Sequence, residues 1–194
     1  MTTAPKSLPP RMTMADFLDW PGDGTAKRYQ LVDGEPRAMA PASATHGAIQ
    51  ATLARLIGNR LVEAGRRCRA VTEPAVMPRL RADMNLRVPD IGVTCTRIER
   101  GQIVLPDPVL LVEILSPSNE RETWENVWAY STIPSVQEIL VVHSTRIMAE
   151  LLRRSDDLSW PEAPEAIGPD GTLRLESIDF TCPLSEFYEE THLA

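Results

Sequence analysis

The sequence predicts an α/β fold in which a mixed β-sheet is flanked by helices. Short apolar runs typical of strands alternate with helical patterns along the chain. The runs "LLVEIL" and "EILVVH" enclose a helical segment, which favours a right-handed β-α-β crossover. The chain has 194 residues, 43% of them hydrophobic, and no internal repeat or linker divides it. We therefore expect a single domain over residues 1–194 with a substantial core.

The first half of the chain predicts a hairpin and a long helix. Residues 1–12 look like a loose tail, and "MTMADFLDWPG" predicts a short helix capped by Thr13. Asp33-Gly34 lies between two short strand patterns and is typical of a hairpin turn. The segment "SATHGAIQATLARLIGNRLVEAG" has apolar residues at helical spacing and ends at Gly65, so it predicts an amphipathic helix.

The second half predicts strands around one further helix. The helix is "NERETWENVWAYSTI", opened by Ser118 or Asn119 and closed by Pro134. We expect a short strand and a final helix near residues 184–190 at the C-terminus. The other strand patterns are "CRAVTEPAVMP", "VPDIGVTC", "PVLLVEIL", "VQEILVVHS" and "RIMAELLRR".

Composition limits the functional classes. The net charge of −7 argues against a protein whose whole surface binds nucleic acid, although a local basic groove remains compatible with it. No apolar run approaches the roughly 20 residues that span a bilayer, and the N-terminus lacks the apolar region of a secretory signal. We therefore expect a cytoplasmic protein without a membrane partner. The three cysteines are scattered and odd in number, so we expect neither zinc nor a disulfide framework.

Two carboxylates in strand patterns form the first candidate site. Glu113 interrupts the apolar run "LLVEIL". Burying a carboxylate there costs roughly several kcal/mol unless a partner compensates its charge. Asp90 opens the earlier pattern "PDIGVTC". If these strands are neighbours, the two carboxylates can point at one spot, and a hard cation such as Mg²⁺ would remove their mutual repulsion. On spacing alone, the structural alternative is favoured: Glu113 pairs with a buried arginine and Asp90 caps a turn.

Four stretches together resemble the Uma2 family of restriction endonucleases, also called DUF820. The resemblance runs from about Tyr29 to Val142, over half of the chain. It implies a restriction-endonuclease-like core of the PD-(D/E)xK superfamily and an endonuclease that hydrolyses DNA phosphodiester bonds with Mg²⁺ or Mn²⁺. The stretches are "RYQLVDGEPRAMAPASATHGAIQATL", "VPDIGV", "LLVEILSPSN" and "SVQEILVV".

The resemblance assigns the metal ligands. Pro89-Asp90 matches the "PD" of the superfamily and Glu113 matches its (D/E), so both would hold the metal. Two further residues match positions near the site, Glu35 in "VDGE" and His46 in "SATHG". Without the resemblance, Glu35 is an exposed strand residue and His46 a polar residue in the first turn of a helix, where an anion would also be well placed.

The superfamily lysine is missing. It usually lies two residues after the glutamate, where this chain has Leu115. In Uma2 proteins it lies four residues before the tyrosine of the next helix, and counting back from Tyr130 gives Asn126. Of the chain's two lysines none follows Lys27, and Arg121, at the start of the same helix, cannot act as a base. The alternative function is therefore a catalytically degenerate protein that keeps the nuclease fold for a binding or regulatory role.

Partners follow from the same interpretation. DNA is the expected substrate, and a homodimer would allow both strands to be cut. Trp124 and Trp128 share one helix at a spacing that favours a core or dimer face. An arginine cluster either follows a phosphate backbone or forms a solvated helix face. Its members are Arg55, Arg60, Arg66, Arg67 and Arg69.

Overall fold

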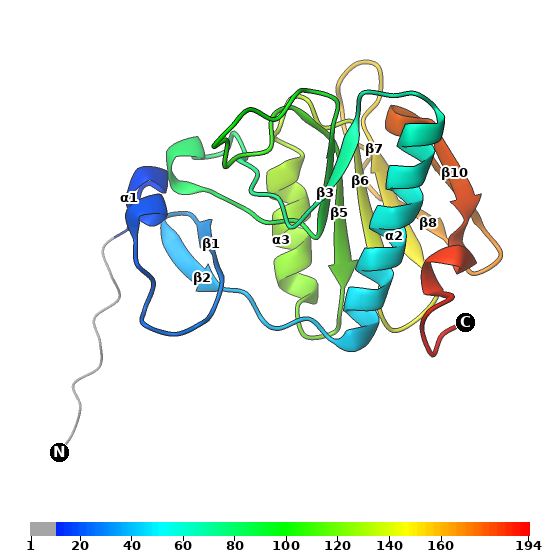
Figure 1. The fold of residues 1–194 in the computed structure, drawn as a ribbon, viewed down its shortest axis with the longest axis horizontal. Coiled ribbons are helices and arrows are strands. Elements are labelled where there is room, and N and C mark those ends of the chain that lie inside the picture. The colour runs from blue at the N-terminus through cyan, green and yellow to red at the C-terminus, as the bar shows by residue number, and fades with distance from the viewer. Residues whose placement is uncertain (1–10) are drawn as a thin grey trace.

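The computed structural model describes residues 11–194 and confirms the mixed sheet flanked by helices (Figure 1). The main sheet has six strands in the order β3–β4–β5–β6–β7–β8. Its central pair, β5 and β6, is parallel and connected through α3, while the other neighbouring pairs are antiparallel. The strands span Arg69–Thr72 (β3), Ile91–Thr94 (β4), Pro108–Leu115 (β5), Glu138–His143 (β6), Ala149–Arg153 (β7) and Glu165–Ile167 (β8). The helices are α1 (Met14–Asp19), α2 (Ala44–Glu63) and α3 (Glu120–Tyr130).

The two faces of β5 serve two separate cores. Val112 and Ile114 pack in a core with α2, whereas Leu111 and Leu115 pack in a second core with α3. Side chains alternate between the faces of a strand, so Glu113 lies on the α3 face. The apolar run is therefore buried on both sides, and its one carboxylate points toward the helix that follows it.

The start of α2 agrees with expectation, whereas α3 ends at Tyr130, before the expected stop at Pro134, and receives no side-chain cap from Asn119. Ser43 caps α2 by accepting the backbone N–H of His46 at 3.1 Å, and Gly65 (φ 61°) follows the end of that helix. Asn119 precedes α3. The first turn of α2 therefore starts at a fixed place, which sets the position of His46.

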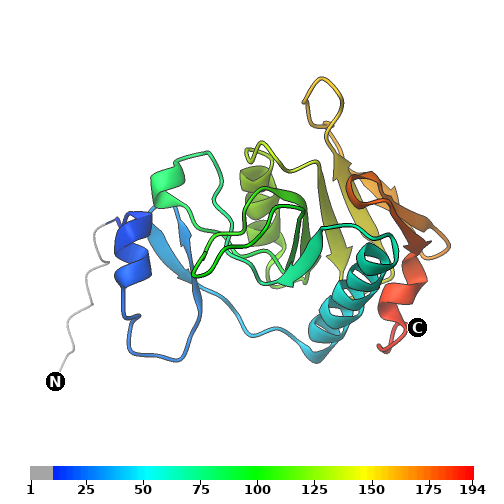
Figure 2. The ribbon, with the colours of Figure 1, turned by 45° about the horizontal axis from the view of Figure 1, so that its top comes forward.

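An N-terminal hairpin lies at one end of the molecule, next to α1 (Figures 1 and 2). Asp33 and Gly34 both have positive φ, 49° and 84°, which is the two-residue turn that the sequence predicts. Met12 donates its backbone N–H to Gly34 O at 2.8 Å, so the last part of the expected tail contacts the hairpin. Residues 1–10 of that tail lie outside the described part. The hairpin strands are β1 (Tyr29–Val32) and β2 (Glu35–Ala38).

The C-terminal region differs from expectation. In place of one strand and a helix, it contains two strands after β8 and a short 3₁₀ helix, η3. Their apolar side chains join the core around α2, and Figures 1 and 2 show β10 and the chain end beside that helix. These segments are too short for a clear helical or strand period, so packing decides their form. They are β9 (Thr172–Leu175), β10 (Phe180–Pro183) and η3 (Leu184–Tyr188), and two further 3₁₀ turns are η1 (Ala82–Met84) and η2 (Glu176–Ile178).

A disulfide joins Cys68 and Cys95, so the expectation of unpaired cysteines was wrong. The antiparallel register pairs Arg69 with Thr94, which brings the two flanking cysteines opposite each other. Their separation of 27 residues hides this proximity in the sequence. Cys182 is free and buried. Over residues 11–194, no helix has both the length and the apolar character needed to cross a bilayer.

Candidate functional site

A cleft of about 790 Å³ lies where the N-terminal hairpin, the start of α2 and the start of α3 meet. Its lining includes four residues proposed from the sequence, His46, Asp90, Glu113 and Asn126. Lys27 and Arg28, from the loop before β1, line the same cleft. The site is therefore built from segments far apart in the sequence.

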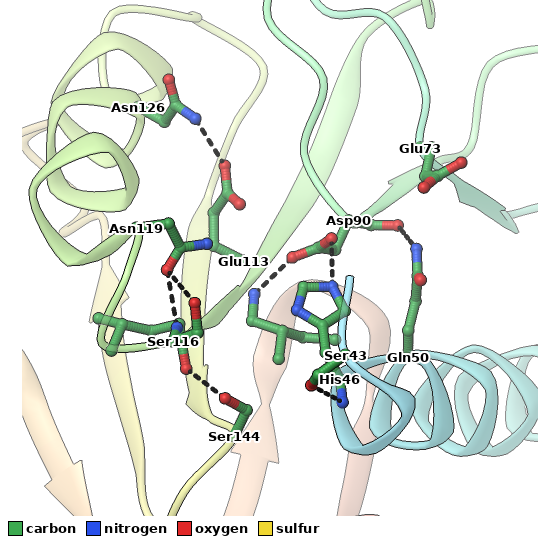
Figure 3. A network of polar contacts seen from close by, with 12 residues as sticks. Ser43, His46, Gln50, Glu73, Asp90, Glu113, Ser116, Asn119, Asn126 and Ser144 are labelled. Carbon is green, nitrogen blue, oxygen red and sulfur yellow. Dashed lines mark hydrogen bonds and ion pairs between the residues drawn. The ribbon is translucent and has the colours of Figure 1, made fainter. Parts of the chain in front are cut away.

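Asp90 and Glu113 come together because β4 and β5 are antiparallel neighbours. The register pairs Ile91 with Val112, which places the start of β4 beside the end of β5. Asp90 Oδ2 accepts the backbone N–H of Ile114 at 2.6 Å (Figure 3). The carboxylate of Asp90 is thus bonded to the residue that directly follows Glu113.

Glu113 is held by two donors from α3. The Tyr130 hydroxyl donates to Glu113 Oε1 at 2.7 Å, and Asn126 Nδ2 donates to the same oxygen at 3.2 Å (Figure 3 shows the second contact). Glu113 Oε2 has no hydrogen-bond partner among residues 11–194, although the side chain lines the cleft. One oxygen is fixed and the other remains available to a ligand.

Burial and a neighbouring charge raise the pKa of Glu113 and favour its protonated form. Burial raises the pKa of Glu113 to about 8, and the Asp90 carboxylate adds to this effect. The hydrogen bonds from Tyr130 and Asn126 oppose the rise in pKa but do not cancel it. A divalent cation in the cleft would favour the ionised carboxylate and displace its proton.

His46 and Gln50, on the first turns of α2, hold Asp90. His46 Nε2 lies 2.9 Å from Asp90 Oδ1, and Gln50 Nε2 donates to the backbone oxygen of Asp90 at 2.9 Å (Figure 3). Because an ionised carboxylate only accepts, the first bond requires a proton on Nε2. The cap at Ser43 therefore positions Asp90 through His46.

Asn126, to which the family resemblance assigns the position of the missing lysine, connects Glu113 to a buried cation. The Arg87 Nη1–H group donates to Asn126 Oδ1 at 2.7 Å. Arg87 is 5% exposed, and burial lowers the pKa of its guanidinium. The structural alternative, in which Glu113 pairs directly with a buried arginine, is close to this arrangement, but the amide of Asn126 stands between the two.

Two other candidates lie away from the cleft. Glu35, at the start of β2, is exposed and is not among the residues that line the cleft. The side chain of Arg121 is 93% exposed and pairs with Glu125 at 2.9 Å. The structure therefore does not bring Glu35 to the carboxylate pair, and Arg121 does not replace the lysine.

The arginine cluster separates into distinct places. Arg66, Arg67 and Arg69 gather with Arg97 around the Cys68–Cys95 disulfide, beyond the end of α2. A helix of 20 residues is about 30 Å long, so this group lies far from the cleft at the other end of α2. These arginines are not among the residues that line the cleft.

Comparison with known sequences identifies the family. The sequence model of Uma2, described as "Putative restriction endonuclease", matches residues 14–182. The chain belongs to the Uma2 family. A relative of this chain is "Uncharacterized protein slr1290" of Synechocystis sp., which is 28% identical over 159 residues, or 81% of this chain and 82% of that protein.

A solved Uma2-type structure shares the fold. The crystal structure of a "putative nuclease belonging to DUF820" from Anabaena variabilis superimposes with a TM-score of 0.72. The superposition covers 91% of this chain and 97% of that chain, at 20% identity. It supports the restriction-endonuclease-like architecture of this Uma2 protein.

The sequence did not predict the contact between Gln30 and Glu122 at the Uma2 cleft, although the resemblance marks Gln30 as a position where the family usually has glutamate. Gln30 is 2% exposed, and its Nε2 donates to Glu122 Oε1 at 2.6 Å. Gln30 Oε1 is buried and has no partner in the described part of the chain. Gln30 and Glu122 both line the cleft. The charge of Glu122 adds to the rise in the pKa of Glu113. The contact between Glu122 and Gln30 spans 92 positions, so no local sequence pattern reveals it.

The donor chemistry of this cleft fits a hard divalent cation held by few protein ligands. In residues 11–194, no three His, Cys, Asp or Glu side chains converge closely enough to hold a metal ion. Mg²⁺ is typically held by one or two carboxylates together with water and phosphate oxygens. The pair of Asp90 and Glu113 has that composition, and the unpartnered Glu113 Oε2 supplies a free oxygen.

Proposed function

We propose that this Uma2 protein is an endonuclease that hydrolyses DNA phosphodiester bonds with Mg²⁺ or Mn²⁺ held by Asp90 and Glu113. The observation that carries the proposal is the Asp90–Ile114 hydrogen bond, which fixes the two carboxylates at one place in a cleft. The bound cation would lower the pKa of a water molecule and stabilise charge on the scissile phosphate. The family description and the shared fold support a nuclease.

The protein side chains have supporting tasks in this proposal. His46 and the Ile114 N–H fix Asp90, while Tyr130 and Asn126 fix one oxygen of Glu113. Lys27 and Arg28 at the cleft supply cationic groups that phosphate oxygens can meet.

The charges of the cleft explain why a metal ion is needed before DNA binds. Its lining holds two cations, Lys27 and Arg28, against four carboxyl groups, and all but Glu113, whose raised pKa favours its neutral form, carry a negative charge. Without a metal ion this excess of carboxylates repels phosphate, and a divalent cation offsets the repulsion. The carboxylates are Glu73, Asp90, Glu113 and Glu122.

The test combines metal binding with plasmid nicking. We expect the wild-type protein to bind Mn²⁺ in calorimetry and to nick supercoiled plasmid in Mg²⁺ or Mn²⁺. Asp90→Asn and Glu113→Gln should abolish both signals. Glu150→Gln is the matched control, because Glu150 is a partly buried strand carboxylate bonded to His143 at 2.8 Å outside the cleft.

The outcomes separate the candidate functions. Metal binding that persists unchanged in both cleft variants would contradict the proposed metal site. Metal binding without nicking in any protein would favour the catalytically degenerate alternative. Sedimentation of the same samples, with and without DNA, would show whether the expected homodimer forms.

A further inference from the structure

Arg87 is a buried cation without a carboxylate partner. It is 5% exposed, and its guanidinium forms no salt bridge with any Asp or Glu of residues 11–194. Arginine remains protonated in proteins, so this site carries a permanent positive charge. A buried charge of this kind is costly unless neighbouring groups compensate it.

Two asparagine oxygens compensate Arg87. Its Nε–H and Nη2–H groups donate to Asn85 Oδ1 at 3.3 and 3.1 Å, and its Nη1–H group donates to Asn126 Oδ1 at 2.7 Å. Asn85 is anchored in turn, because its Oδ1 accepts the backbone N–H of Asp33 in the hairpin turn. The guanidinium is therefore fixed from the hairpin side and points at α3.

This arrangement decides which way the Asn126 amide faces. Arginine has only donors, so Asn126 must offer its oxygen to Arg87, and its NH₂ group then faces Glu113. Reversing the amide would place two donor groups against each other and an oxygen against Glu113 Oε1. Arg87 thus acts on Glu113 through the side-chain amide of Asn126.

We propose that Arg87 is the fixed cation of this site and orients Glu113 for metal binding through the amide of Asn126. Arg87 is a positioning residue in this proposal, which rests on the proposed metal site. The contact of Arg87 with Asn126 holds Oε1 of Glu113 and leaves Oε2 directed to the cleft. Asn126 is then part of an alternative arrangement in which the positive charge lies at position 87 in place of position 126.

The proposal has a sharp consequence for restoring the family lysine. A lysine at position 126 would remove the oxygen that Arg87 contacts and put a second cation beside the guanidinium. Asn126→Lys alone should therefore be harmful, and it should become acceptable only when Arg87 is neutral. The fold should therefore tolerate a positive charge at position 87 or at position 126, but not at both.

The experiment is a set of double variants measured by thermal unfolding. Arg87→Met should lower the Tm in the wild-type background by roughly 5 °C, because it leaves the oxygens of Asn85 and Asn126 without the donors of Arg87. In the Asn126→Lys background the same substitution should raise the Tm. In the Asn126→Asp background it should lower the Tm more than in wild type, because it leaves a second buried carboxylate beside Glu113.

If Arg87→Met lowers the Tm of the wild type but raises the Tm of the Asn126→Lys variant, positions 87 and 126 are directly coupled. An Arg87→Met effect that is equal in all three backgrounds would overturn the proposal. If the Asn126→Lys protein does not fold, recovery of soluble protein in the double variant gives the same answer, and the Asn126→Asp comparison remains independent of it.

A second readout tests the effect on Glu113. Arg87→Met should weaken Mn²⁺ binding about tenfold, the size typical of a lost partner behind a metal ligand, while Arg87→Lys should retain most of the affinity. Equal affinity in wild type and Arg87→Met would overturn the positioning role. If no protein binds metal or nicks DNA but the sign reversal persists, the proposed function fails while the coupling of positions 87 and 126 stands.

Discussion

The backbone N–H of Ile114 donates to Asp90 Oδ2 at 2.6 Å, so the strand that carries one carboxylate also holds the other. This bond brings the Asp90 charge close enough to contribute to the raised pKa of Glu113. The pair is unfavourable for the metal-free protein and suited to binding a cation. Residues kept for function often oppose stability in this way.

The pH dependence of stability should show that ionised Glu113 is unfavourable beside Asp90. The pKa of Glu113 is about 8 in the folded protein against an ordinary value of 4.5, so the folded state holds one more proton than the unfolded state between these values. The contribution of Glu113 to stability is therefore present below pH 4.5 and is lost as the pH rises through 8. Glu113→Gln, which resembles the protonated carboxyl group, should be more stable than the wild type above pH 8.

Metal binding should release the proton that Glu113 holds in the folded protein. At pH 7, Mn²⁺ must displace the proton from Glu113, so calorimetry in buffers of different ionisation enthalpy should detect release of about one proton per ion. Well above pH 8 the release should vanish and the apparent affinity should level off. Equal proton release at pH 7 and pH 9.5 would contradict the role of Glu113.

Tyr130→Phe should weaken the site at small cost to the fold. The substitution removes one hydrogen bond to Glu113 Oε1 and retains the ring, so we expect a loss of about 1 kcal/mol in the free energy of unfolding. Mn²⁺ affinity should fall about tenfold because Oε1 is no longer fixed. Tyr188→Phe is the control: the Tyr188 hydroxyl donates to His143 O and Met148 O, so stability should fall similarly and metal affinity should not change.

The sequence was sufficient for the sheet because its strands carry their own signals. The apolar run of β5, the cap at Ser43 and the turn at Asp33-Gly34 are local features, and each has the form expected. The expected strand after Cys68 stops early, since Glu73 adopts a positive φ of 49°. Pro74 directly follows Glu73 and cannot donate a hydrogen bond to a strand ladder, so it was the one sequence signal for this break.

The site was only partly accessible from the sequence. The spacing of Asp90 and Glu113, together with the family resemblance, predicted that they meet, and the structure places them together. The Arg87–Asn126 contact spans 39 positions and joins a loop to a helix. Such a contact leaves no periodic signal, because it depends on how separate elements pack.

His46→Leu should loosen Asp90 and weaken Mn²⁺ binding by about 10- to 100-fold, the range seen when a partner of a metal ligand is lost. The matched control is His143→Leu. Both histidines are buried and lie beside a carboxylate, His46 with Asp90 and His143 with Glu150. A loss of metal affinity of the same size in both variants would mean that general destabilisation explains the effect.

Glu35→Gln should leave metal binding and nicking near wild-type levels. Glu35 is exposed on β2 and outside the cleft, so removing its charge changes nothing beside Asp90 or Glu113. Plasmid nicking and Mn²⁺ calorimetry check this directly. Abolished nicking with intact metal binding would instead show that Glu35 takes part in the reaction, in line with its match to a family residue near the site.

Cys68→Ser should destabilise the fold without affecting the site. Cross-linking residues 27 positions apart restrains the unfolded chain by about 3.5 kcal/mol in the loop-entropy account, so the Tm should fall by roughly 10 °C. Reductant should lower the Tm of the wild type to the same level and have no effect on the variant. Denatured, unreduced wild-type protein should show one free thiol, from Cys182. Mn²⁺ affinity should remain unchanged, because Cys95 lies just past the end of β4 and Asp90 directly precedes its start. Three free thiols in the denatured wild-type protein would contradict the disulfide.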